Sequence, residues 1–392
     1  MISFLFRYGA VFFMVNTIFL SAYIFHKAGV LLFPAIMGIF ALLALIYFKT
    51  TLQLLLTKPF MIFLAVNLIN LLHLLFVHTS FASFQYFITK FVIFFIISAS
   101  LFFNEEYYYD KFFKHLIYIG LFFAFASILY SPHFSGGYKG IIGNRNEFGL
   151  LMSTTLGVMY LYKEKHSRKE KALMVFLVLL ILMSGSRNAL IGVFLAWIFK
   201  NGISWKIISF IPIFFIALYV LDYYHIETSI TRISTEGDQL HDRRMEWYYA
   251  WLTFKNKMWL GYGLEHYAYI DQSLVPLYLK RLYGAVMAHN SYLAGLVLYG
   301  LLFSIAIYGV IFLTVLPFYL TSITSKFYRS NKTVKIYLYI LTFTLISSIF
   351  ESHMFGINAF HGFMFWFSIG ASSLLYYRFK RGEFPFDQKA RS

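Results

Sequence analysis

The sequence predicts an all-α, polytopic membrane protein with about twelve transmembrane helices and one large extracytoplasmic loop between the ninth and tenth helices. Hydrophobic residues make up 60% of the 392-residue chain, charged residues only 13%, and the mean hydropathy is +0.68. Soluble domains are roughly 45–50% apolar and about 25% charged. In addition, apolar runs near the roughly 20 residues that one span requires recur along the chain. The chain has no cysteine, which excludes disulfides and thiolate metal sites.

The formal net charge of +16 is distributed in short basic clusters between the apolar runs. Such clusters orient helices in a membrane, so we expect membrane lipids and no nucleic acid as partners. Near the N-terminus, the lone Arg7 precedes a long apolar run without a small-residue cleavage site. We therefore expect a retained first span rather than a cleaved signal peptide.

Twelve segments are apolar enough for predicted spans, and the seventh and eighth are short. They are Phe4–Phe25, Gly29–Phe48, Pro59–Val77, Phe84–Phe103, Phe113–Tyr130, Phe148–Tyr162, Ala172–Met183, Ala189–Phe199, Ile207–Leu221, Ser291–Pro317, Val334–Phe350 and Phe360–Tyr377.

Lysine and arginine concentrate in alternate loops, and cytoplasmic loops carry this excess. The clusters Lys163–Lys171 and Arg378–Arg391 fall on the same side as both termini. This distribution predicts cytoplasmic termini and an extracytoplasmic interval His225–Ala288. The predicted organisation is therefore helices 1–9 in residues 1–222, a loop with an interfacial helix in 223–288, helices 10–12 in 289–377, and a basic cytoplasmic tail in 378–392.

Aromatic residues recur at helical spacing in the middle of the long loop. The series runs through Trp247, Tyr248, Trp251, Phe254, Met258 and Trp259. Tryptophan and tyrosine favour headgroup depth, so the series predicts a helix lying in the membrane interface.

Arginines on the outer side are candidates for an anion site. Arg187 opens the eighth span, where a forked guanidinium beside helix N–H groups suits a phosphate or diphosphate. Snorkelling at a helix end is the simpler alternative. Arg243 and Arg244 precede the aromatic series, and a surface salt-bridge cluster with nearby carboxylates explains them equally well.

Polar residues also open the sixth and tenth spans. Arg145 and Asn146 follow a glycine-rich segment, where helix capping explains most of the pattern, although Arg145 can also join an anion site. His289 and Asn290 open the tenth span. A histidine there is more often a cap, but neutral imidazole is also the usual general base, and Asn290 can orient it or a sugar. No two histidines have convincing metal-ligand spacing, so we expect no metal and no other cofactor.

Four motifs together resemble the bacterial O-antigen ligase and O-antigen polymerase superfamily. The first is His-Asn-x9-Gly, formed by His289, Asn290 and Gly300. The others are a Ser-Arg-x-x-Leu start to a span at Ser186–Leu190, an Arg-x-x-x-Trp from Arg243 to Trp247, and Leu-Gly-x-Gly at Leu260–Gly263. The spacing to the last motif favours Arg243 over Arg244 as the matching arginine.

The resemblance implies a glycosyltransferase that moves a glycan from undecaprenyl diphosphate to an acceptor hydroxyl at the outer face of the bacterial inner membrane, without a metal. It implies catalytic roles for His289, Arg243 and Arg187, and substrate contacts for Arg244, Arg145, Asn290 and Asn146. Arginines suit the diphosphate leaving group, histidine suits the role of base, and a single displacement inverts the anomeric centre.

Two acceptors remain open within the superfamily. A polymerase uses the next lipid-linked repeat, whereas a ligase uses lipid A-core; other polysaccharide assembly proteins are possible further partners. Gly143-Asn144-x-Asn146 and the modest outer loop favour a polymerase. A flippase or transporter is the alternative from another class, but transporters place their ionisable groups near the midplane, often within repeats. Here most of these groups lie at the outer surface.

Overall fold

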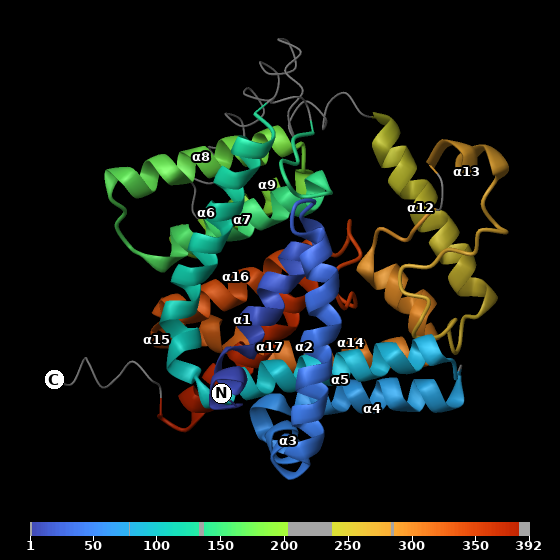
Figure 1. The fold of residues 1–392 in the computed structure, drawn as a ribbon, viewed down its shortest axis with the longest axis horizontal. Helices are drawn as coiled ribbons and strands as arrows, with labels where there is room; N and C mark the ends of the chain where they lie inside the picture. Colours follow the sequence, from blue (N-terminus) through green and yellow to red (C-terminus); the bar gives the residue numbers. More distant parts are fainter. Residues whose placement is uncertain (1, 78, 133–136, 203–236, 284–285, 384–392) are drawn as a thin grey trace.

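The computed structural model describes residues 2–77, 79–132, 137–202, 237–283 and 286–383 (Figure 1). Every named element in these ranges is helical, which confirms the all-α prediction. The helices are α1 (Ile2–Ser21), α2 (His26–Ile46), α3 (Phe48–Leu56), η1 (Lys58–Phe60), α4 (Met61–Phe76), α5 (Phe81–Phe103), η2 (Tyr107–Lys111), α6 (Phe112–Tyr130), α7 (Arg145–Tyr162), α8 (Arg168–Ser184), α9 (Arg187–Asn201), α12 (Gly237–Asn256), α13 (Leu277–Tyr283), α14 (Ser291–Thr324), α15 (Lys326–Ser330), α16 (Lys332–Ser347) and α17 (Phe360–Lys380).

Six helical segments of the described chain are long and apolar enough to cross a membrane: α1, α2, η1 with α4, α5, η2 with α6, and α14. They coincide with the first five predicted spans and the tenth. The sixth, seventh, eighth, eleventh and twelfth predicted spans are helices as well, namely α7, α8, α9, α16 and α17. The ninth, Ile207–Leu221, lies outside the described residues. The total of twelve spans therefore remains a prediction.

Large apolar side chains cover much of the outer surface of these helices. Leu129 is 85% exposed, Leu31 74% and Leu313 69%. An aqueous surface rarely carries such broad apolar cover, whereas hydrocarbon favours it. The protein is accordingly an integral membrane protein.

The innermost helix is α17, whose side chains from Phe360 to Leu375 are all buried. Trp366 packs edge-on against Phe94 of α5, with ring centroids 5.1 Å apart, and Phe94 stacks on Phe63 of α4 at 4.7 Å. Small residues such as Gly370 let neighbouring helices approach α17 closely. These small and hydroxylated side chains also lower its hydropathy, which explains why α17 falls outside the six apolar segments.

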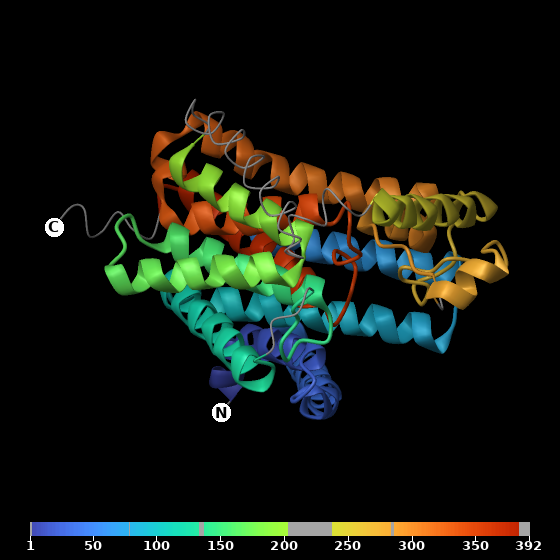
Figure 2. The same ribbon diagram turned by 90° about the horizontal axis from the view of Figure 1, so that it is seen from above.

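Charged residues gather at one end of the bundle. Arg378 pairs with Glu105 at 2.9 Å, and Lys332 pairs with Asp110 at 2.6 Å. The start of α1 reaches the same end, because the Tyr108 hydroxyl donates to the carbonyl of Arg7 at 3.0 Å. At the opposite end, the C-terminal end of α12 and the segment that follows it lie near the junction of α4 and α5 (Figures 1 and 2). Arg378 and Lys332, two of the basic residues that were predicted to be cytoplasmic, therefore share one end of the molecule.

The helix α14 is interrupted at Gly300, and the segment that follows α12 fills the interruption. Gly300 has φ 65° and ψ 178°, so the helical bonds from residues 301 and 302 to residues 297 and 298 are absent. Tyr262 and Gly263 donate instead to the carbonyls of residues 297 and 298 at 2.9 and 3.2 Å. In return, Leu301 and Leu302 donate to the carbonyls of residues 258 and 259 at 2.7 and 3.2 Å.

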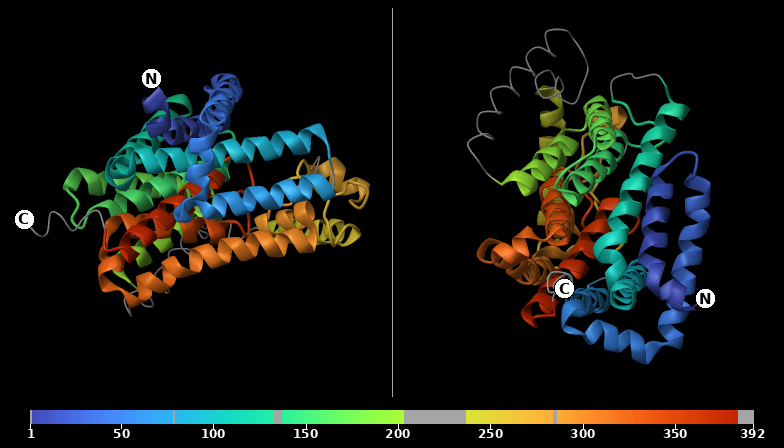
Figure 3. Two further views of the ribbon diagram at one scale, coloured as in Figure 1. Left: turned by 90° about the horizontal axis from the view of Figure 1, so that it is seen from below. Right: turned by 90° about the vertical axis from the view of Figure 1, so that its left-hand side faces the viewer.

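The helix predicted from the aromatic series is present, but it is shorter than expected. Trp247, Trp251 and Phe254 lie on α12, which ends at Asn256 and packs against α14. Met258 and Trp259 lie beyond its end, so their assignment to the helix was wrong. Their backbone carbonyls bind α14 instead, which draws the chain away from a helical path. Figure 3 shows α14 alongside α4, and His73 of α4 contacts the carbonyl of Leu260 at 2.9 Å.

Candidate active site

A carboxylate that was not singled out from the sequence lies at the centre of the polar cluster. Glu351 follows α16, and its side chain is 8% exposed. Its Oε1 accepts from Arg243 Nη2 at 3.1 Å and from Asn146 Nδ2 at 2.7 Å, while its Oε2 lies 3.3 Å from His289 Nδ1. Buried Glu351 therefore joins three residues from α12, α7 and the start of α14.

A second carboxylate completes the cluster from α12. Arg243 Nη1 donates to Glu246 Oε2 at 3.0 Å, one helical turn along. The other oxygen of Glu246 lies 3.9 Å from His289 Nε2. The imidazole thus has a carboxylate near each ring nitrogen, and Arg243 bridges the two carboxylates.

The surroundings shift the two carboxylates in opposite directions. Burial acts to raise the pKa of Glu351, but the hydrogen bond with His289 and the charge of Arg243 outweigh it, and the pKa lies below its ordinary value. Burial raises the pKa of Glu246, against the opposing effects of His289 and Arg243. Glu351 is therefore the firmly ionised member, and Glu246 is the easier one to protonate.

Ser291 fixes the loop that carries Glu351. Its hydroxyl donates to the carbonyl of Glu351 at 2.8 Å and accepts from the amides of His353 and Met354 at 2.8 and 3.1 Å. Its own amide donates to the carbonyl of Ser348 at 2.8 Å. The residue next to His289-Asn290 thereby sets the position of Glu351 relative to His289.

The structure distinguishes the two loop arginines. Arg243 forms the ion pairs of the cluster, whereas Arg244, the next residue on α12, is exposed. Trp247 lies one turn further and donates from Nε1 to the carbonyl of His289 at 3.4 Å. The spacing of arginine and tryptophan therefore places both side chains on the face of α12 that meets the start of α14.

The remaining predicted residues have other described positions. Asn290 caps α14, and its Oδ1 accepts from the amides of Tyr292 and Leu293 at 2.9 and 3.0 Å. Arg145 opens α7, and its guanidinium lies beside Gly137. Arg187 opens α9, which packs against α7. Among the described residues, the hydrogen bonds given above for Glu351, Glu246, His289 and Arg243 do not extend to Arg145, Arg187 or Arg244, and Arg145 and Arg187 make further interactions.

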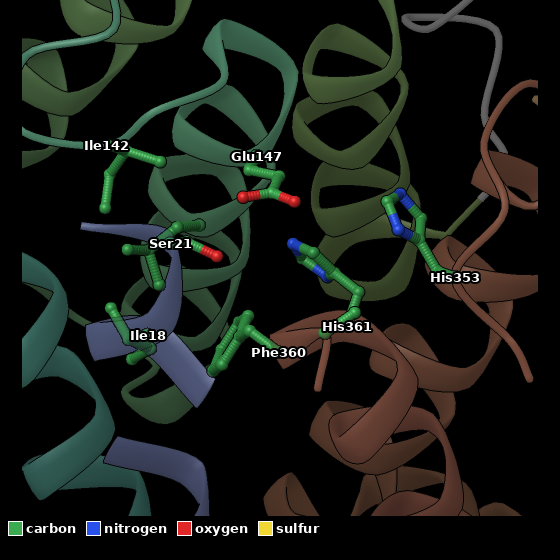
Figure 4. A pocket seen from close by; sticks show the side chains of 9 residues that line it. Ile18, Ser21, Ile142, Glu147, His353, Phe360 and His361 are labelled. Carbon is green, nitrogen blue, oxygen red and sulfur yellow. The ribbon is translucent and has the colours of Figure 1, made fainter. Parts of the chain in front are cut away.

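A small cavity lies between the starts of α7 and α17 and the loop that follows Glu351. Its volume is about 20 Å³, enough for one water molecule, and Glu147, His353 and His361 point into it (Figure 4). The Nε2 atoms of both histidines are buried and have no hydrogen-bond partner among the described residues. Burial lowers the pKa of His353, although Glu351 opposes this shift, and burial raises the pKa of Glu147. Across the described ranges, no three histidine, aspartate or glutamate side chains are grouped so that they could hold a metal ion.

Sequence reasoning missed Glu351 and Glu246 as members of the cluster. Glu246 lies one turn from Arg243, a spacing that permits an ion pair on a helix. Glu351 begins the loop between α16 and α17, 62 positions after His289, and its sequence neighbours form no motif. The available signal was a single carboxylate at the end of an apolar segment, where burial of a charge requires a partner.

The fold and the cluster together define an integral membrane protein with a histidine, a carboxylate and an arginine joined at one end of a helical bundle. Residues 172–308 match the O-antigen ligase family, which confirms the resemblance to the O-antigen ligase and polymerase superfamily. The match includes Arg187, Arg243 and His289 and ends before Glu351. No curated protein sequence matches the chain.

Proposed function

We propose that the protein is an O-antigen polymerase of the bacterial inner membrane, which transfers a glycan from undecaprenyl diphosphate to the hydroxyl of a lipid-linked acceptor. The observation that supports this proposal most strongly is the contact of buried Glu351 with both His289 and Arg243. It brings a candidate base and a candidate anion-binding group to one place. Family membership alone gives neither the base nor its orientation.

His289 acts as the general base in this proposal. A carboxylate near Nδ1 favours the tautomer with the proton on Nδ1, which leaves Nε2 free to accept a proton. The acceptor oxygen forms a bond to the anomeric carbon, its proton moves to Nε2, and the bond from that carbon to the diphosphate oxygen breaks. A single displacement of this kind inverts the anomeric configuration.

Arg243 stabilises the departing diphosphate, and no metal takes part in this proposal. A guanidinium is permanently charged and offers paired N–H groups to phosphate oxygens. Its two present partners are carboxylates, so the incoming diphosphate has to compete with them. Burial raises the pKa of Glu246. Protonation of Glu246 would free Nη1 of Arg243 to bind the donor. Arg187 supplies a second charge in this proposal, with Arg145 and Arg244 as further donor contacts.

The choice of polymerase over ligase depends on the glycine and asparagine pattern before α7 and on the modest outer loop. The family description, O-antigen ligase, favours the ligase as the second candidate. A strain that lacks the protein separates the two by its lipopolysaccharide. A core with one repeat indicates polymerase, whereas bare core with accumulated lipid-linked polymer indicates ligase. Wild-type chain length in that strain would contradict both functions.

The proposal also places the cluster on the periplasmic side, with both termini in the cytoplasm. The charged end that holds Arg378, Lys332 and Lys163 supports this orientation, because positive loops remain inside.

A further inference from the structure

A groove of about 1280 Å³ lies between α2 and α5, beside the loops that follow α1 and α16. The two walls that α2 and α5 form are apolar. They consist of Val30, Phe33, Pro34 and Met37 of α2 and of Phe84 and Ile88 of α5. The lining of α2 runs from His26 to Met37, about 16 Å along the helix, or about half of a 30 Å hydrocarbon layer. Val30 and Phe84 are 49% and 48% exposed, so the groove faces the lipid.

The remaining wall of the groove, nearest the loops, is polar and rich in hydrogen-bonding groups. It contains Asn144, Glu147, Glu265, Ser352 and Asn358. Carboxylate and amide oxygens accept from hydroxyl groups, so this wall suits a glycan. Among the described residues that line the groove, none is arginine or lysine, and both carboxylates repel a diphosphate placed against this wall.

Positive charge is found at the lip of the groove instead. Tyr23 and His26 line the lip, and Lys139 Nζ donates to the hydroxyl of Tyr23 at 3.2 Å. The groove therefore offers, in order, an apolar channel at hydrocarbon depth, a cationic lip and a polar wall. These three parts match the hydrocarbon, phosphate and sugar parts of a glycolipid.

The polar wall leads to the candidate active site. Ser352 lines the groove and directly follows Glu351, and the hydroxyl of Tyr267, another lining residue, donates to the carbonyl of Ser352. Glu147 lines both the groove and the small cavity between the starts of α7 and α17. Arg243, the candidate ligand of the leaving diphosphate, approaches Glu351 from α12 and does not line the groove.

Starting from the proposed function, we propose that the groove between α2 and α5 binds the acceptor, a second polyprenyl-diphosphate-linked glycan. Its prenyl chain lies between the two helices, its diphosphate at the lip near Lys139, and its glycan along the polar wall toward Ser352. The donor occupies the arginine side of the cluster. A lipid A-core acceptor, which bears several anionic groups, fits a wall with two carboxylates poorly.

The matched pair Val30→Trp and Leu31→Trp tests this assignment. The two residues are neighbours on α2, but only Val30 lines the groove, while Leu31 is 74% exposed on the outside of the helix. Each protein is assayed in phospholipid nanodiscs with a donor whose accepting hydroxyl is blocked and an acceptor whose anomeric oxygen is replaced by methylene. Each substrate can then act in one role only.

Val30→Trp should raise the KM for the acceptor about tenfold or more, with the donor KM and the kcat at saturating acceptor within about twofold of wild type. Leu31→Trp should behave as wild type. The wild type should also prefer a full-length prenyl acceptor over a two-isoprene acceptor, and Val30→Trp should lose that preference. A rise in the donor KM would indicate that the groove binds the donor. Unchanged KM and kcat values would indicate that the groove holds only bulk lipid. Either result overturns the proposal.

A binding measurement separates failure of this inference from failure of the proposed function. The acceptor analogue carries a photoreactive diazirine in its prenyl chain and is cross-linked to the full-length protein. Labelled peptides from α2 and α5 support the acceptor groove, even in a protein that transfers nothing. Labelling elsewhere, or equal labelling by a diazirine phospholipid, overturns it. Transfer to lipid A-core but not to the prenyl acceptor would also overturn it, whereas wild-type inactivity with every acceptor contradicts the proposed function.

Discussion

His289 has two alternative roles, helix cap and general base, and the neighbours of its imidazole favour the second. The capping role belongs to Asn290, whose side chain accepts from two amides of α14, while His289 faces Glu351 and Glu246. His289→Asn should therefore fold and express normally but lose about 10²-fold or more in turnover, because the proton acceptor is missing. Transfer from a purified lipid-linked donor measures this loss. His166→Asn, at the charged end of the bundle, is the control, and near-normal turnover by His289→Asn would exclude the catalytic role.

Glu351 should matter through its charge rather than its size. Glu351→Gln keeps the shape of the side chain but places an amide where His289 Nδ1 finds a carboxylate, which disturbs the tautomer. The expected loss in kcat is about 10²- to 10⁴-fold, comparable to the loss on neutralising the carboxylate of a catalytic triad. Steady-state kinetics with expression measured in parallel provide the test, with Glu164→Gln at the opposite end as control. Retained kcat would assign Glu351 a structural role only.

His353 predicts a pH dependence of stability. Burial lowers its pKa in the folded protein, whereas an unfolded histidine titrates near 6.5. Just below about pH 6.5 the unfolded state binds more protons, so the free energy of unfolding should fall as the pH decreases, by at most about 1.4 kcal/mol per pH unit. His353→Gln should reduce the decrease in Tm between about pH 7.5 and pH 5.5 relative to wild type. Exposed His26→Gln is the control, and an unchanged pH dependence in His353→Gln would contradict the assignment.

The site was only partly predictable residue by residue. Residue type and spacing identified His289, Arg243 and Asn146, because His289 and Asn146 lie at the starts of helices and Arg243 lies four positions before Trp247 in a motif. Glu351 could not be found in this way, since its proximity to His289 depends on how α16 and its following loop pack against the start of α14. Likewise, Arg243 and Arg244 have the same chemistry, and only the direction in which α12 presents them separates the two.

At the scale of elements, two motif glycines have a shared structural cause. A Cβ added at Gly300 would lie 2.4 Å from the amide nitrogen of Gly261, and one added at Gly261 would lie 2.4 Å from that of Gly300. Both residues also have positive φ, 65° and 74°. The Leu-Gly-x-Gly motif and the last glycine of His-Asn-x9-Gly are thus two halves of one contact between the segment after α12 and α14.

Gly300→Ala should consequently destabilise the protein strongly. The backbone conformation of Gly300, φ 65° and ψ 178°, is nearly restricted to glycine and costs roughly 1–3 kcal/mol for a residue with a Cβ, and the clash is with backbone rather than with a flexible side chain. We expect a marked decrease in the Tm of the detergent-solubilised protein together with loss of transfer, because the contact positions α12 relative to His289. Gly309→Ala on the same helix has open space around it and should leave both unchanged. Equal Tm values for the two variants would refute this explanation.

The helices themselves were largely predictable, since apolar length governs membrane helices. The break in α14 was not, because the segment Ser291–Pro317 is apolar throughout and Gly300 is one of several glycines in it. Similarly, the aromatic series predicted a helix correctly as far as Phe254. Its end depends on backbone pairing with a helix that follows later in the chain, which local periodicity does not encode.

At the scale of the whole molecule, the charged end should face the cytoplasm and the cluster the periplasm. The chain has no cysteine, so single substitutions can be labelled without background. In intact spheroplasts, Arg244→Cys should react with a membrane-impermeant maleimide, whereas Lys165→Cys should react only after lysis. Both positions are exposed, which makes them a matched pair. The reverse pattern would invert the orientation and place the cluster on the wrong side for a periplasmic acceptor.

The contact at Gly300 also limits the order in which the chain can be integrated during translation. Residues 258–263 leave the ribosome before α14 has been synthesised, so the backbone groups that will pair with it have no helix to bind. An unpaired backbone group costs several kcal/mol in hydrocarbon, and α14 alone would expose four such groups at its interruption. We therefore expect residues 258–263 to remain in the aqueous phase until α14 has been synthesised. The segment and the helix then enter the bilayer together as one unit.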